Sequence, residues 1–170
     1  TMATDITLNG HDEMFLRFFT DEYYADNTMS IVFNKTEYIL PKHMSNENAD
    51  KIETFIVSGC KVPDFLILNS TISTKVKHEL AVMLYKQELE AGIIDENVKK
   101  YLKRTIKSIA CDAIKNNPEM LKDILDFKLI DKTGLEYLLD VADSCKKITE
   151  KAYIVNAIKN LSSKTSSFKL

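Results

Sequence analysis

Glycine and proline are scarce in this sequence, with four and three copies in 170 residues. β-sandwiches and barrels need many tight turns, and these two residues supply most of them, so the scarcity argues against both classes. No apolar run approaches the ~18 residues that a membrane-spanning helix needs. No basic stretch followed by an apolar run, typical of a secretory signal, is visible near residue 1. We therefore expect a soluble cytoplasmic protein without a membrane partner.

Cysteine is also sparse, and its pattern is uninformative for chemistry. The three copies, Cys60, Cys111 and Cys145, lie far apart and form no Cys-x-x-Cys pair. Disulfide frameworks and zinc ribbons need paired or closely spaced cysteines, so neither is expected. We predict free thiols that are buried or half-buried in a reducing compartment.

Histidine motifs and glycine-rich loops are missing as well. His11, His43 and His78 share no metal-ligand spacing with a cysteine or an acid, and no second histidine follows His78-Glu79 at the spacing of a zinc protease. A pairing of His43 with Cys60 or Cys111 as a nucleophile has no local support. Four isolated glycines build neither a nucleophile elbow nor a phosphate-binding loop. The sequence thus predicts no enzyme, no metal and no cofactor.

The composition is that of an ordinary globular protein and favours helices. The hydrophobic content is 45%, the charged content is 28%, and the net charge is −2. A length of 170 residues suits one compact domain. Lysine, leucine, isoleucine, glutamate and alanine dominate most of the second half, which favours helices. We predict a mainly α fold, either a helical array or an irregular bundle.

The first 45 residues differ from the rest and hold the predicted β-structure. Residues 11–25 place aromatic side chains at helical spacing, although a strand is the competing interpretation of "MFLRFF". Next come two β-rich runs, 30–33 and 37–40, on either side of Asn34-Lys35-Thr36. They predict a hairpin that ends at Pro41 and that must pack on helices to be stable.

Helix boundary signals follow one another from residue 47 onward. A helix is predicted before Gly59, and a short apolar helix after Pro63. We then expect a helix at 75–91, capped by Thr74 and closed by Gly92. Asp95 is the expected cap of a long helix, and its predicted inner face consists of Val98, Leu102, Ile106, Ile109 and Ala113.

Asn117-Pro118 is predicted to end that long helix and to begin the next one. Proline cannot continue a helix but is favoured at a first helical position, and asparagine caps well. Leu121, Ile124 and Leu125 share the apolar face of the new helix, which is expected to end near Phe127.

Two further helices are predicted from their caps. Thr133 and Glu136 have the spacing of a capping box. Thr149 is the expected cap of the last helix, with a hydrophobic staple between Ile148 and Tyr153. The two helices carry apolar stripes at Leu135, Leu138, Leu139 and Ala142, and at Ile154, Ala157, Ile158 and Leu161. We predict a helical region over 46–162, packed with residues 1–45 as one domain, and a disordered tail at 163–170.

The spacing of these predicted caps indicates a repeated unit. Asn117 and Thr149 lie 32 residues apart, and each is expected to begin the second helix of a pair. Over residues 105–161, "ACDAIKNNPEMLKDILDFKLID" and the weaker copy "LLDVADSCKKITEKAYIVNAI" resemble degenerate ankyrin-repeat helix pairs. The Thr-Pro-Leu-His start and the turn glycine of that family are absent. The resemblance implies a protein-binding array, whose missing units the earlier helices would have to supply.

Two candidate surfaces follow. Phe19 and Tyr24 are candidate partner-binding residues in the aromatic N-terminal stretch, although such stripes more often belong to a core. Opposite the apolar face of the long helix lie Lys99, Lys100, Lys103, Arg104 and Lys107, a candidate anion-binding face. The plainer interpretation of that face is a solvated surface that pairs with acidic neighbours. We expect a non-catalytic interaction module with an unidentified protein partner, and alternatively a nucleic-acid-associated protein that uses the basic face.

Overall fold

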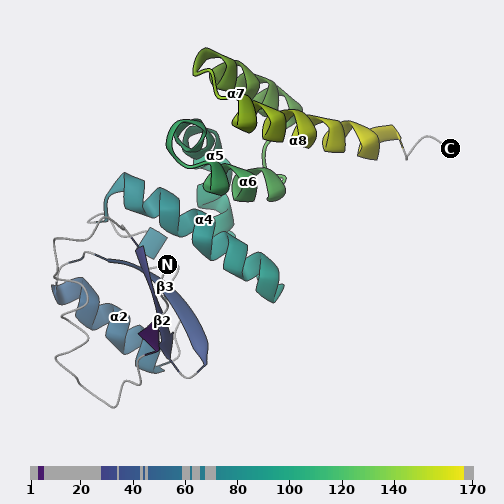
Figure 1. Ribbon diagram of the computed structural model, residues 1–170. Coiled ribbons are helices and arrows are strands. Elements are labelled where there is room, and N and C mark those ends of the chain that lie inside the picture. The colour runs from purple at the N-terminus through teal and green to yellow at the C-terminus, as the bar shows by residue number, and fades with distance from the viewer. Residues whose placement is uncertain are drawn as a thin grey trace. The chain divides into compact units, whose positions relative to one another are not determined.

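The computed structural model describes residues 4–5, 28–33, 35–42, 44, 46–58, 62, 66–67 and 72–166 of the chain (Figure 1). The fold is mainly α with a small β-hairpin ahead of the helices, as predicted. The chain forms two compact units, Thr1–Lys99 and Lys100–Leu170, and the boundary falls in the first turn of α5. No helix in the described ranges is both long and apolar enough to cross a membrane.

The hairpin of the first unit consists of β2 (Thr28–Phe33) and β3 (Thr36–Pro41), which pair antiparallel with Phe33 opposite Thr36. Two residues connect the strands, and Lys35 has a φ of 65°, as primed hairpin turns require. β3 ends at Pro41, as predicted. A third strand, β1 (Thr4–Asp5), pairs in parallel with β2; no sequence pattern had indicated it.

The prediction that the hairpin packs on a helix is confirmed by α4 (Thr74–Ala91). The Gln87 side chain donates a hydrogen bond of 3.0 Å to the Glu37 carbonyl oxygen. The Thr28 hydroxyl lies 3.4 Å from the Met83 sulfur. Ile31, Ile39, Leu40, Leu80 and Leu84 are buried in this unit.

The boundaries of α4 correct one predicted cap. Ser73, not Thr74, is the N-cap, and its side chain accepts a hydrogen bond from the Val76 N–H. Serine and threonine side chains both cap helices, so the sequence alone does not decide which of the two adjacent residues is the N-cap. Gly92 ends α4 as predicted, with a φ of 71° in the left-handed region.

Helix α2 (Asn46–Ser58) also belongs to the first unit and agrees with its predicted span. Ile52 and Ile56 are buried, and Phe55 is half-buried. Of the short helix predicted after Pro63, Leu66 and Ile67 lie in the described ranges; both are helical and buried.

Helix α5 (Glu96–Asn116) follows the sequence prediction closely. The Asp95 carboxylate accepts hydrogen bonds from the Asn97 and Val98 N–H groups, at 2.7 and 3.3 Å. All members of the predicted inner face are buried: Val98, Leu102, Ile106, Ile109 and Ala113.

The corner at Asn117-Pro118 is confirmed. The Asn117 side chain accepts a hydrogen bond of 3.1 Å from the Met120 N–H, and Pro118 is the first residue of α6 (Pro118–Asp126). Phe127 is the C-cap. Leu121 and Ile124 are fully buried, whereas Leu125 is only half-buried.

The predicted caps of the last two helices are wrong. Helix α7 (Lys132–Ser144) is capped by Asp131, whose carboxylate accepts a 2.8 Å hydrogen bond from the Gly134 N–H, so Thr133 lies inside the first turn. Helix α8 (Ile148–Ser166) begins one residue before Thr149. Ile148 is 83% exposed, which rules out the predicted staple with Tyr153. α8 continues to Ser166, into the segment predicted to be disordered.

Within the second unit, α8 packs against both α7 and α6, and Figure 1 shows α7 and α8 side by side. α5 approaches α7 where the Lys107 ammonium group lies 3.4 Å from the Asp131 carboxylate. The packed helix pairs of this unit are α7–α8 and α6–α8. The resemblance to ankyrin repeats and the predicted division at residue 45 remain predictions.

Candidate functional site

The aromatic partner-binding candidates Phe19 and Tyr24 lie outside the described residues, as do His11, His43 and Cys60. His78 is half-buried on α4. Within the described ranges, no three His, Cys, Asp or Glu side chains gather closely enough to hold a metal ion.

The basic face of α5 is partly occupied by ion pairs and ring contacts. In the first unit, the Lys99 ammonium group lies 3.2 Å from the Glu96 carboxylate. In the second, Lys107 pairs with Asp131, and the Arg104 guanidinium lies 5.7 Å from the centre of the Tyr101 ring. These contacts favour the interpretation as a solvated helix face.

Two lysines of that face remain available. Lys100 and Lys103 are exposed, and neither forms an ion pair with any described residue. Burial raises the pKa of Tyr101, and the nearby Arg104 charge opposes that shift. Two uncommitted cations are a weak basis for phosphate binding, since each phosphate contact adds only one counterion-release contribution.

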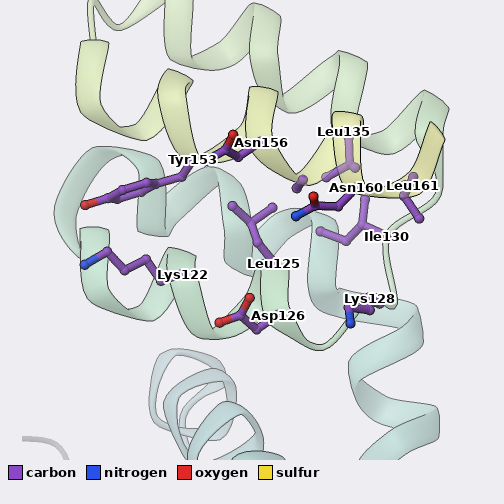
Figure 2. Close-up of a pocket in the computed structure, with 11 residues that line it drawn as sticks. Lys122, Leu125, Asp126, Lys128, Ile130, Leu135, Tyr153, Asn156, Asn160 and Leu161 are labelled. Atoms are coloured by element: carbon purple, nitrogen blue, oxygen red, sulfur yellow. The ribbon is translucent and has the colours of Figure 1, made fainter. Parts of the chain in front are cut away.

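A cavity of about 460 Å³ lies between α6, α7 and α8 in the second unit (Figure 2). We call it the α6–α8 groove. Its apolar lining comes from all three helices and the α6–α7 connection: Leu125, Ile130, Leu135, Tyr153, Ala157 and Leu161. Its volume lies within the ~300–1,000 Å³ that ligand sites span in proteins.

The groove follows from the amphipathic pattern of α6 and α8. Ile130 and Leu135 are buried beneath it, whereas Leu125, Ala157 and Leu161 are only half-buried. The sequence interpretation assigned Leu125, Ala157 and Leu161 to core stripes, because periodicity marks which residues share a face but not how completely a neighbour covers it. That is why sequence reasoning missed this site.

One end of the groove is fixed by a contact between α6 and α8. The Lys122 ammonium group lies 3.0 Å from the Glu119 carboxylate and 5.0 Å from the centre of the Tyr153 ring. Hydrogen bonding to Glu119, and then to Tyr153, raises the pKa of Lys122. The cation therefore stays protonated and already has partners at neutral pH.

The opposite end carries Asp126, the last residue of α6, and Lys128, which follows the helix. Lys128 is exposed and has a φ of 55°, so the chain turns there through a left-handed residue. Among the described residues, its ammonium group forms no ion pair.

Two carboxamides complete the lining. Asn156 and Asn160 come from α8, four residues apart and therefore on one face of the helix (Figure 2). Each carboxamide carries two N–H donors and one oxygen acceptor. Apolar contact surface flanked by such groups can bind and orient a ligand.

A second feature of this unit is a thiol–phenol contact. Cys111 and Cys145 are free and half-buried, in agreement with the sequence prediction. Burial raises the pKa of the Cys111 thiol, against the effect of a hydrogen bond from Tyr137. A raised thiol pKa lowers the thiolate fraction at neutral pH.

Comparison of the chain with protein-family models, curated proteins and solved structures finds no match.

Proposed function

We propose that this protein is a non-catalytic interaction module, built on stacked helix pairs, whose protein partner docks in the α6–α8 groove. The observation that carries the proposal is the half-buried apolar surface of Leu125, Ala157 and Leu161 inside a concave, polar-rimmed site. An apolar concavity left open to solvent marks a binding site more often than scattered exposed side chains do. Free thiols at Cys111 and Cys145 suit a cytoplasmic module.

The test is affinity capture from host lysate with matched variants of the full chain. Asn156→Arg places a long cation at the groove, whereas Asn116→Arg alters an exposed asparagine at the end of α5, outside it. We expect a protein captured by wild type and Asn116→Arg, but not by Asn156→Arg, to bind again when both components are purified. Equal capture by all three chains would refute docking in the groove.

A second candidate, nucleic-acid association through the basic face of α5, keeps support from Lys100 and Lys103. Nuclease treatment and a salt titration separate it from the first. Binding lost with nuclease, weakened steeply by salt and abolished in Lys103→Glu would favour nucleic acid. Binding that survives both treatments would favour the groove.

A further inference from the structure

We propose that Cys111 and Cys145 form a redox-sensitive thiol pair, which hydrogen peroxide converts to a disulfide between α5 and the end of α7. In the reduced protein both thiols are free and half-buried. Neither residue lines the α6–α8 groove. Disulfides in a reducing compartment are mostly transient and serve redox sensing, so a pair that closes and reopens is compatible with free thiols.

Cys111 lies in the middle of the α5 face that meets α7. Lys107, Cys111 and Lys115 are spaced by four residues and therefore share this face. The Lys107 ammonium group lies 3.4 Å from the carboxylate of Asp131, the N-cap of α7. Beyond the other end of α7, the Lys147 ammonium group donates a hydrogen bond of 2.9 Å to the Lys115 carbonyl oxygen. Contacts on both sides of Cys111 thus hold its face toward α7.

The second thiol is held near the first. Cys145 precedes Lys147 by two residues, so the contact of Lys147 with the end of α5 brings Cys145 to the same place. Burial is the largest cause of the raised pKa of Cys111, and the nearby Cys145 raises it as well. The two thiols therefore lie close enough to interact electrostatically.

Cys145 can move toward Cys111 without the unfolding of a helix. It lies in the short connection between α7 and α8, outside both helices, and Lys146 after it has a φ of 56°. A disulfide requires the two Cα atoms to lie about 4.4–6.8 Å apart. Bond formation draws this connection toward α5 and releases Cys111 from its hydrogen bond with Tyr137.

The reaction consumes one molecule of hydrogen peroxide for each disulfide. One thiolate attacks a peroxide oxygen, so that an S–O bond forms, the O–O bond breaks and hydroxide leaves. The second thiolate attacks the sulfur of this sulfenic acid, so that the S–S bond forms and a second hydroxide leaves. The two thiol protons convert both hydroxides to water. The sulfurs lose two electrons in total, and the peroxide gains them.

The disulfide would restrain the second unit. Its cysteines lie 34 positions apart, and the loop that it closes contains all of α6 and α7. A cross-link stabilises a fold mainly because it removes conformational freedom from the unfolded chain. Oxidation should therefore raise the urea midpoint of the protein. It would also restrain two of the three helices that line the α6–α8 groove.

The experiment treats the reduced full chain, at low protein concentration, with hydrogen peroxide. Remaining thiols are alkylated, and tryptic peptides are identified by mass spectrometry without reduction. Lysines separate Cys60, Cys111 and Cys145 in the sequence, so each cysteine leaves in its own peptide. The chain unfolded in urea is oxidised in parallel, because any two of its three cysteines can pair there.

We expect the folded monomer to form the Cys111–Cys145 disulfide. Relative to the two other pairings, it should be enriched by about tenfold over the unfolded chain, since the fold raises the effective concentration of these two thiols. Dithiothreitol should reverse the reaction. The urea midpoint should rise on oxidation of wild type and stay unchanged in Cys145→Ser.

Two lysine variants test how the fold positions the pair. Lys147→Met should lower the yield of the disulfide in the folded chain, because Cys145 is no longer anchored to the end of α5. Lys146→Met removes an exposed lysine that is still closer to Cys145 in sequence, and it should keep the wild-type yield.

The same mixture of pairings in the folded and the unfolded chain would overturn the proposal. So would an unreacted chain, disulfide-linked dimers, or sulfinic acids in place of the internal disulfide. Equal yields in the two lysine variants would refute the positioning of Cys145 through Lys147. An unchanged urea midpoint after complete oxidation would refute the restraint of the second unit.

Discussion

The Lys147 ammonium group donates a hydrogen bond of 2.9 Å to the backbone carbonyl oxygen of Lys115, 32 residues earlier in the chain. Lys115 is in the last turn of α5, where carbonyl groups have no partner within the helix and the helix dipole is negative. The residue before α8 thus caps the end of α5. The same ammonium group lies 3.9 Å from the Glu150 carboxylate, whose side chain is largely buried.

Replacing Lys147 by methionine should therefore destabilise the protein. The Lys115 carbonyl loses its donor and Glu150 loses its counter-charge, at a cost of about 1 kcal/mol. Equilibrium urea denaturation measures the effect. Lys146→Met at the neighbouring exposed position is the control and should stay within about 0.5 kcal/mol of wild type. Equal stability of the two variants would contradict the capping role.

Asn117→Ala should destabilise the protein by about 1 kcal/mol, since the Met120 N–H at the start of α6 loses its acceptor. Asn116→Ala is a matched control, because Asn116 is exposed at the last position of α5 and the N-cap of α6 is Asn117. Thermal unfolding followed by circular dichroism compares the two. A lower midpoint in Asn116→Ala than in Asn117→Ala would show that the corner depends on another interaction.

Gly134→Ala tests packing against helix propensity. Alanine is favoured over glycine inside a helix by about 1 kcal/mol. However, an added Cβ would lie 2.6 Å from Ile130 Cγ2, 2.8 Å from Asp131 Oδ1 and 2.8 Å from Lys107 Cε. Ile130 is buried and Asp131 caps the helix, so we expect a net loss of about 1–3 kcal/mol from overpacking. Urea denaturation measures the change in the free energy of unfolding. A variant more stable than wild type would show that these neighbours shift to make room for the added methyl group.

Asp131 should make stability depend on pH in the acid range. The Gly134 N–H and then Lys107 hold the pKa of this carboxyl below its ordinary value of 3.8. Because the folded-state pKa is the lower one, the stabilisation is fully present above the unfolded pKa and is lost as pH falls through the folded pKa. Carbon-13 NMR titration of the carboxyl group should give a midpoint below 3.8.

Two variants check the causes of that shift. Asp131→Asn does not titrate, so its difference in stability from wild type should shrink as pH falls below the unfolded pKa. Lys107→Met should move the Asp131 midpoint upward but not fully back, since the Gly134 hydrogen bond, the larger cause, remains. A midpoint at or above the ordinary value in wild type would refute the cap assignment.

The sequence predicted a helix end correctly where one residue met the hydrogen-bonding or backbone requirement of that end. Asp95 and Asn117 each provide an acceptor for a backbone N–H, Pro118 suits a first helical position, and Gly92 provides a left-handed backbone, and the structure uses all of them. The hairpin was predictable for the same reason, because its two β-rich runs and Pro41 leave one way to pair.

Local signals failed where neighbours compete. Ser73 displaced Thr74, and Asp131 displaced Thr133. Asp131 also faces Lys107, which lies 24 positions away in sequence. Such a contact is invisible to a pattern read along the chain, and so is the short parallel pairing of β1 with β2.

The sequence by itself determined the helical class of this protein, the N-terminal hairpin and the α5–α6 corner, because each depends on hydrogen bonds and backbone preferences among residues close in the chain. Only the tertiary structure decided the site. Whether Leu125, Ala157 and Leu161 are covered or left open depends on how α6, α7 and α8 approach one another. An apolar stripe has the same period in either case, so only packing distinguishes a core from a groove.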